Sequence, residues 1–199
     1  MFNHKILIRL LVVGLMLSFV MSIAAQDDER VKLTQDFTFN LATGEMVIFS
    51  YPEGWVIESI PVFSDEEYIS FAAFLTNDIE LPLSLDSEID SGDIMVNLFP
   101  FPYAIPQTIL ATNDLFELTN AYQLSNFNSE EFDMEFAELG NREIVVGDYT
   151  NEFDHRRYGL LLDNIFIFAE FTTPVGELSQ HTALMNEIIN SVDVATMQN

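Results

Sequence analysis

The side chains that could carry out chemistry are few in this 199-residue sequence. Cysteine is absent, and beyond residue 25 the histidines are His155 and His181. Nucleophilic catalysis needs an activated nucleophile beside an oriented base, and no Gly-x-Ser-x-Gly motif is present. Two histidines without a shared spacing argue against a zinc site, and there is no glycine-rich phosphate loop or dinucleotide fingerprint. We therefore assign no catalytic residue and no cofactor.

The two histidines have different settings. His181 lies on the apolar face of a predicted C-terminal helix, which is typical of a structural histidine. His155 belongs to the one basic cluster of the sequence, which we place at the tip of a hairpin between strands around Glu152 and Tyr158. This cluster can either receive a carboxylate or phosphate group or pair with neighbouring acids. The candidate anion contacts are His155, Arg156 and Arg157.

An acidic loop is predicted from residue 75 to residue 93. Acidic residues occupy alternate positions from Asp86 onward, as at the start of a calcium loop. The EF-hand pattern then fails, because Ser91 stands where glycine is needed and Asn97 stands where a bidentate glutamate is needed. A weak surface calcium site is the remaining metal hypothesis, with Asp86, Glu88, Asp90 and Asp93 as its candidate ligands.

A stiff apolar loop is predicted from Phe99 to Pro106. Its three prolines favour an extended backbone, which would direct every second side chain the same way. That row either fills the core of the domain or stands at its rim as an anchor for a partner. The candidate contacts are Phe99, Phe101, Tyr103 and Ile105.

The elements that must position these residues follow an export signal. Residues 1–25 combine a basic start, a charge-free apolar run and the small residues Ser22, Ala24 and Ala25. Cleavage is expected after Ala24 or after Ala25. The apolar run is shorter than a permanent membrane helix requires, although an uncleaved anchor is the alternative. The absence of cysteine excludes a lipoprotein, so we expect a secreted, periplasmic or cell-surface protein.

The charge balance restricts the partners. The sequence has 32 acidic and 7 basic residues, a net charge of −25, and every acidic residue follows the signal. Such a surface repels nucleic acids and anionic membranes. Basic proteins and divalent cations are compatible with it, and so is a solvated acidic surface without a ligand.

Periodicity predicts one α+β domain over residues 36–194, after a loose lead-in at 26–35 and before a tail at 195–199. About eight or nine antiparallel strands form a central sheet, with a mid-chain helix and a C-terminal helix packed on it. The mid-chain helix is capped by Thr112 or Asn113 and continues to about Leu124. Near Phe132, apolar residues alternate with Asp133, Glu135 and Ala137, which predicts a strand with one wet face.

A strand, a tight turn and the single tryptophan organise the start of the domain. Met46–Phe49 is apolar throughout, which predicts a strand covered on both faces, and Pro52 ends it. Trp55 then opens the next strand as a largely buried residue, and Pro61–Glu66 interrupts that strand.

The segment Phe49–Trp55, with Tyr51, Pro52 and Gly54, resembles the opening of the PsbP-like superfamily. The ending Glu187–Val192 resembles the last helix of the same family. The family is named for an extrinsic protein of photosystem II and includes many exported bacterial proteins. The resemblance implies an antiparallel sheet flanked by helices. No position matches a photosystem or metal-binding motif, so no functional residue is transferred.

Two functional hypotheses follow. The first is an exported, non-catalytic binding or accessory domain whose partner is an unknown protein or envelope component. The second is a carboxylate-dependent hydrolase, for which a buried carboxylate pair with raised pKa values in a deep cleft would be the evidence. A weakly calcium-binding acidic surface protein is a further alternative.

Overall fold

Ten strands and two helices make up the part of the chain that the computed structural model describes, namely residues 32–41, 43–64, 67–78, 89–102, 114–127, 133–163 and 165–196. The predicted signal peptide, most of the predicted lead-in and the last residues of the predicted tail lie outside these ranges. Among the described residues, no helix is both long enough and apolar enough to cross a membrane.

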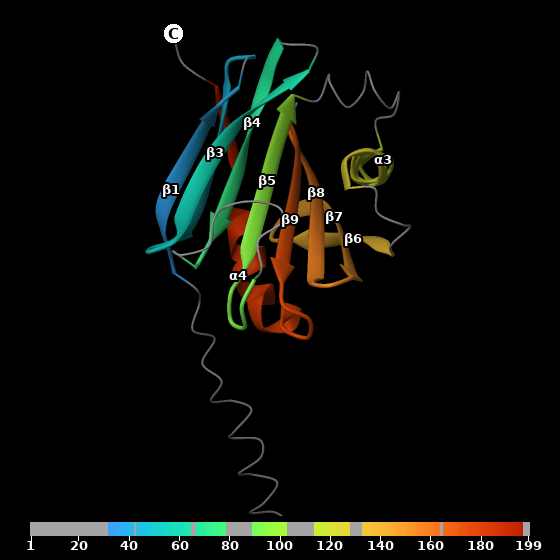
Figure 1. Ribbon diagram of the computed structural model, residues 1–199. Helices are drawn as coiled ribbons and strands as arrows, with labels where there is room; N and C mark the ends of the chain where they lie inside the picture. Colours follow the sequence, from blue (N-terminus) through green and yellow to red (C-terminus); the bar gives the residue numbers. More distant parts are fainter. Residues whose placement is uncertain are drawn as a thin grey trace, which may run out of the picture. The chain divides into compact units, whose positions relative to one another are not determined.

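A seven-stranded antiparallel sheet dominates the domain (Figure 1). Its strand order is β3-β4-β5-β9-β8-β7-β6. The strands are β3 (Val56–Ser64), β4 (Glu67–Thr76), β5 (Met95–Pro102), β6 (Met134–Leu139), β7 (Arg142–Thr150), β8 (Asp154–Leu162) and β9 (Ile165–Thr173). Two-residue connections join β6 to β7 and β8 to β9, as the Gly140–Asn141 and Asp163–Asn164 pairs predict.

A smaller sheet joins the two ends of the described chain. Its order is β1-β2-β10, with β1 (Leu33–Asn40), β2 (Glu45–Pro52) and β10 (Asp193–Thr196). The predicted α+β class with an antiparallel sheet is confirmed, but the strands divide between two sheets. They divide because β2 pairs with the C-terminal strand on the side opposite β1.

The mid-chain helix α3 (Leu115–Phe127) begins one or two residues later than a cap at Thr112 or Asn113 predicts. The carboxylate of Asp114 accepts hydrogen bonds from the backbone N–H groups of Phe116 (2.9 Å) and Glu117 (3.1 Å), so Asp114 is the N-cap. The proposed caps, Thr112 and Asn113, lie outside the described residues. The C-terminal helix α4 (Leu178–Ser191) has the predicted apolar face, with Met185, Ile188 and Ile189 buried.

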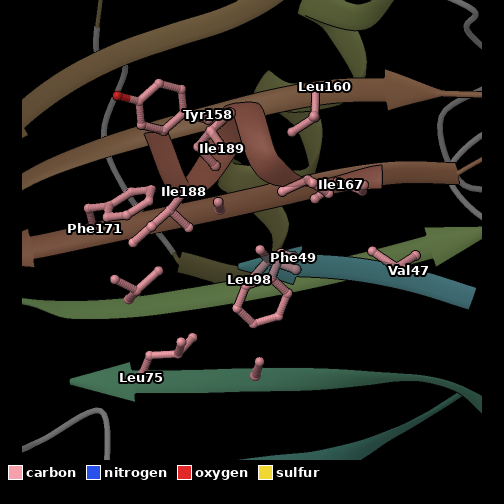
Figure 2. Close-up of a cluster of buried hydrophobic side chains, with 14 of the residues drawn as sticks. Val47, Phe49, Leu75, Leu98, Tyr158, Leu160, Ile167, Phe171, Ile188 and Ile189 are labelled. Atoms are coloured by element: carbon pink, nitrogen blue, oxygen red, sulfur yellow. The ribbon is translucent and has the colours of Figure 1, made fainter. Parts of the chain in front are cut away.

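The large sheet separates two hydrophobic clusters, and β9 contributes to both. Ile165, Ile167, Ala169 and Phe171 belong to the larger cluster, which also contains residues of the small sheet and of α4. Figure 2 shows side chains from β2, β4, β5, β8, β9 and α4 gathered there. Phe166 and Phe168 pack on the opposite face with Leu118 of α3. We call these two sides the α4 face and the α3 face.

Gly159 determines how closely α3 packs against the large sheet. A Cβ atom at Gly159 in β8 would lie 1.9 Å from Oγ1 of Thr119, far inside van der Waals contact. Thr119 is itself buried, and its hydroxyl donates to the Leu115 carbonyl oxygen (2.7 Å). Only glycine therefore lets this helix turn pack so closely against β8.

The segment around the tryptophan is less buried than predicted. In β2, Val47 and Phe49 are buried while Met46 and Ile48 are only half-buried, because the small sheet is covered on one face. Trp55 is half-buried in the turn before β3 and packs against the edge of the larger cluster. The expectations of a doubly covered strand and a largely buried indole were therefore wrong.

Two prolines predicted to break strands lie inside strands. Pro61 is part of β3, which is the first strand of the large sheet and can accommodate a residue without an N–H donor. Pro100 and Phe101 are part of β5, so the predicted loop begins later than Phe99. The register of β4 with β5 ends at Leu98, so Pro100 lies beyond the last β4 partner.

The faces of β6 also differ from the prediction. Phe136 is 52% exposed, and its ring centroid lies 5.8 Å from that of Phe116 in α3. Ala137 and Leu139, on the opposite side of the strand, pack against the larger cluster. The prediction buried the face with Phe136 and exposed the face with Ala137. The structure shows the reverse, because the larger cluster lies on the α4 face of this strand.

Candidate functional site

The basic cluster lies within strand β8 and not at a hairpin tip. The turn between β7 and β8 consists of residues 151–153, so Asp154 already pairs with Thr150. Successive side chains of a strand point to opposite faces. Arg156 and Tyr158 therefore lie on the α4 face, whereas His155 and Arg157 lie on the α3 face. The three candidate anion contacts are divided between two environments.

An open groove of about 640 Å³ lies on the α4 face, beside the last three strands of the large sheet. We call it the β6–α4 groove. This volume is within the range of small-ligand sites in proteins. Its lining residues are Asp133, Met134, Glu135, Ala137, Glu138, Leu139, Ile144, Val146, Gly147, Asp148, Arg156, Tyr158 and Asn186.

Arg156 is held by a carboxylate at the groove wall. Its Nε and Nη2 atoms each donate to an oxygen of Asp148 at 2.7 Å, and its Nη1 donates to the hydroxyl of Thr182 at 3.0 Å. The Asp148 hydrogen bonds raise the pKa of Arg156 above its ordinary value. The guanidinium charge is therefore fixed in place and largely neutralised by its partner.

Tyr158 forms part of the groove floor. It is 1% exposed, and its hydroxyl donates to Oδ1 of Asn186 in α4 (2.8 Å). Burial raises the pKa of Tyr158 to about 12, although the nearby Arg156 lowers it in part. The phenol consequently stays protonated at neutral pH and serves as a hydrogen-bond donor.

The α3 face carries a buried ion pair. Nε of Arg157 donates to Oε2 of Glu170, and these residues are 1% and 4% exposed. Nη2 of Arg157 donates to the hydroxyl of Tyr149 at 2.8 Å, and the guanidinium carbon lies 4.3 Å from the centroid of that ring. Burial raises the pKa of Glu170, while Arg157 lowers it in part.

His155 lies beside this ion pair as a buried, neutral residue. Nδ1 is 3.1 Å from the Thr172 hydroxyl, Nε2 is 3.0 Å from Oδ1 of Asn151, and the ring stacks on Tyr149 with centroids 4.3 Å apart. Burial, followed by the charge of Arg157, lowers the pKa of His155 to about 4, although Asp154 raises it in part. This histidine is thus a packed hydrogen-bonding group at neutral pH.

A buried amide lies next to the ion pair in the sheet. Asn97 of β5 is opposite Glu170 in the β5–β9 register and has no exposed surface. Its Oδ1 and Nδ2 atoms find no hydrogen-bond partner among the described residues. We name Asn97, Tyr149, His155, Arg157 and Glu170 the buried polar cluster.

The other predicted site residues are only partly described. Phe99 and Phe101 lie in β5 and pack on the α3-face cluster, with both rings near Tyr122 (6.4 and 5.1 Å between centroids). Tyr103 and Ile105 lie outside the described residues, and no partner contact is shown.

Only two of the four candidate calcium ligands lie within the described residues. Asp86 and Glu88 lie outside the described residues, whereas Asp90 and Asp93 flank a turn. Within the described ranges, no group of three or more histidine and acidic side chains is placed to hold a metal ion. Burial and the nearby Asp78 and Asp90 raise the pKa of Asp93.

His181 is half-buried on α4, as predicted for a residue on the apolar face. Its Nε2 atom has no hydrogen-bond partner among the described residues. Burial lowers its pKa, and the charges of Glu177 and Asp93 raise it in part.

Sequence reasoning missed Asp148, Tyr149 and Glu170. Glu170 could have been predicted from the sequence, because it is the only charged residue between Ile165 and Thr173, a stretch otherwise typical of a buried strand. A charge in such a strand calls for a partner. Asp148 and Tyr149 were not distinguishable from other residues of β7 without the register.

No protein-family model matches the chain, and no curated protein matches it. Solved structures to which it is similar include a protein of Bacteroides thetaiotaomicron (12% identity, TM-score 0.43), cyanobacterial PsbP from Synechocystis (11%, 0.44) and LpqN, involved in cell envelope biogenesis of Mycobacterium tuberculosis (12%, 0.38). The matches cover 84%, 86% and 81% of this chain and 50%, 99% and 91% of the other chains. The chain thus spans about half the length of the Bacteroides protein. The solved structures to which the chain is similar include a PsbP protein, as the sequence resemblance predicted.

Proposed function

We propose that the protein is an exported, non-catalytic binding domain that takes a positively charged ligand in the β6–α4 groove. The observation that carries this proposal is the charge of the groove lining. Four carboxylates, Asp133, Glu135, Glu138 and Asp148, line the groove together with one guanidinium, which is already bonded to Asp148.

The remaining carboxylates are available to solvent. Asp133, Glu135 and Glu138 are exposed, so a ligand can reach them without moving the fold. Opposite charge accelerates encounter and selects among partners more than it raises affinity. A chain with a net charge of −25 adds a long-range attraction for cationic ligands. The site therefore favours basic proteins, peptides or polyamines.

The groove residues support binding more than catalysis. Tyr158 stays protonated at neutral pH, and both Tyr158 and Arg156 are bonded to neighbouring side chains. The alternative of a hydrolase requires two cooperating carboxylates. Glu170 has a raised pKa, but its partner is Arg157, so the buried polar cluster does not supply that pair.

The proposal that the protein is exported rests on residues 1–25. The partner of an exported protein would be an envelope or extracellular component. Protein recovered from a secreting host should begin at Ala25 or Gln26. Recovery of a membrane-bound product with an intact Met1 would contradict cleavage of the signal. Weak calcium binding remains a separate proposal, which calcium titration would test.

The binding proposal is tested by titrating the protein with spermidine and with a lysine-rich peptide. We expect saturable binding that weakens as salt increases, because the contacts are exposed charges. Glu135→Gln combined with Glu138→Gln should weaken binding about tenfold, a loss of about 1.4 kcal/mol.

A matched control removes the same number of charges elsewhere. Glu53 and Glu58 are exposed at the start of the β3 region, at the far end of the sheet order from β6. Glu53→Gln combined with Glu58→Gln should leave binding within about twofold of the unmodified protein. Equal losses in the two double variants would show a non-specific charge effect and would refute the groove as the site.

A further inference from the structure

The two terminal strands of the large sheet have different edges. The β3 edge contains Pro61, and its register with β4 shifts between Val62 and Phe63. Proline and irregular register are common means of blocking the addition of another strand. In contrast, β6 contains no proline and pairs with β7 in unbroken register from Met134 to Leu139.

The outer side of β6 has no paired strand in the described part of the chain. Within the described residues, β6 pairs with β7 alone and is the last strand of the sheet. In an antiparallel pair, alternate residues direct their N–H and C=O groups away from the partner strand. A six-residue strand therefore presents a row of outward donors and acceptors, which is the template for strand addition.

The β6–α4 groove reaches this edge. Met134 and Glu135 are neighbours whose side chains point to opposite faces, yet both line the groove. The same is true of Glu138 and Leu139. Residues of both faces line the groove, so the groove adjoins the backbone of β6 as well as one face of its side chains.

Charge decides which chain can occupy the edge. Glu135 and Glu138 are exposed on β6, and Asp133 precedes it. A second copy of this chain would bring another strongly acidic surface, and like charges opposite one another destabilise strand pairs. A basic segment would place its cations beside these carboxylates, and opposite-charge pairs across strands are stabilising.

We propose that the β6 edge binds an extended basic peptide segment, which adds to the large sheet as a further strand. The inference rests on the proposed function and specifies its partner class. Backbone hydrogen bonds to β6 provide the general affinity, and lysine or arginine side chains that reach Glu135 on one face of the strand and Glu138 on the other provide the selectivity.

The test compares two peptides that differ only in backbone hydrogen bonding. The first is acetyl-Val-Lys-Lys-Val-Lys-Lys-Val-amide, whose adjacent lysines lie on both faces of an extended strand, and the second is the same peptide methylated on every backbone nitrogen. Charge and side chains are retained in the second peptide, but its donors are lost. We expect the first peptide to bind at least tenfold more tightly to the full chain.

Hydrogen exchange locates the contact. Amides of residues 134–139 should gain protection when the unmethylated peptide binds, while amides of β3 should not change. Charge reversal provides a second test, since Glu135→Lys combined with Glu138→Lys should abolish binding of the lysine peptide and allow a glutamate peptide of the same design to bind. Glu53→Lys combined with Glu58→Lys is the matched control.

The outcomes separate the two proposals. Equal binding of both peptides, weakened by the Glu135 and Glu138 variants, would retain the cationic groove and overturn strand addition. Failure of both peptides and of spermidine to bind would overturn the proposed function as well. A dimer formed through β6, detected by sedimentation and by protection of residues 134–139 without peptide, would overturn the choice of occupant.

Discussion

Arg156 and Arg157 are neighbours in sequence, but they belong to two different physical environments. Arg157 is 1% exposed on the α3 face and is bonded to Glu170 and Tyr149. Arg156 pairs with Asp148 at the groove, where the two side chains are 19% and 45% exposed. Desolvation makes an unpaired buried charge costly, whereas water screens an exposed one. The comparison indicates that the buried Arg157 pair serves stability, whereas the Arg156 pair lies at a surface that solvent can reach.

The largest expected effect comes from breaking the buried pair. Arg157→Met should reduce the free energy of unfolding by about 3–5 kcal/mol, because the Glu170 carboxylate would be left buried without its partner. Urea denaturation measures the change. Arg157→Met combined with Glu170→Leu should recover much of the loss, since no charge then remains buried. A loss below about 1 kcal/mol for the single variant would show that the pair is not a stability element.

The second effect tests the packing of α3 on the same face. Gly159→Ala should cost about 1–3 kcal/mol, because the new methyl group would overlap the Thr119 side chain. A double-mutant cycle with Thr119→Ala isolates the clash. Thr119→Ala should relieve part of the cost, and strictly additive losses would place the strain elsewhere.

The third effect is a pH dependence that belongs to the α3 face. The pKa of His155 is about 4 in the folded protein, below its ordinary value of 6.5. Between these values the unfolded state binds more protons, so His155 makes stability fall as the pH decreases from about 6.5 to about 4. Glu170 has a raised pKa and acts in the opposite direction.

The His155 contribution is therefore measured as a difference between proteins. The stability of His155→Gln should decline less than that of the unmodified protein between pH 6.5 and pH 4, by urea denaturation at each pH. His181 also has a lowered pKa, so His181→Gln serves as a comparison on the other face. Parallel pH profiles for the unmodified protein and His155→Gln would refute the neutral, buried histidine.

The smallest expected effect on stability is at the groove. Asp148→Asn should change the free energy of unfolding by less than about 1 kcal/mol, because its ion pair with Arg156 is partly exposed to solvent. The same variant should weaken binding of a lysine-rich peptide. A stability loss as large as that of Arg157→Met would remove the distinction between the two ion pairs.

Local periodicity was sufficient for much of the fold. The apolar face of α4 and the two-residue turns follow from spacing and turn chemistry, and they fix the α+β class. The start of β8 did not follow, because three of the four residues in Asn151–Asp154 are polar and could each belong to the turn. Which of them form the turn depends on the pairing of β8 with β7 and β9, and no local pattern contains that register.

The candidate site shows the same limit. Alternation along a strand would have placed Arg156 and Arg157 on opposite faces once β8 was known to include both. Their partners, Asp148 and Glu170, come from the two strands beside β8 and depend on register. The groove requires in addition that Asn186 of α4 lies beside β7 and β8, a relation between distant segments.

The small sheet has a consequence for how the chain reaches its native state. Ser191 accepts a hydrogen bond from the Ser50 backbone N–H (2.9 Å), and β10 pairs with β2 from Asp193 to Thr196. These contacts join residues that are synthesised almost a whole domain apart. A nascent chain cannot complete this sheet until residues 193–196 have left the ribosome, and contacts of such long sequence separation slow folding. The native structure thereby registers whether residues 193–196 are present, since a chain that stops before them would lack β10 and would expose an edge of β2.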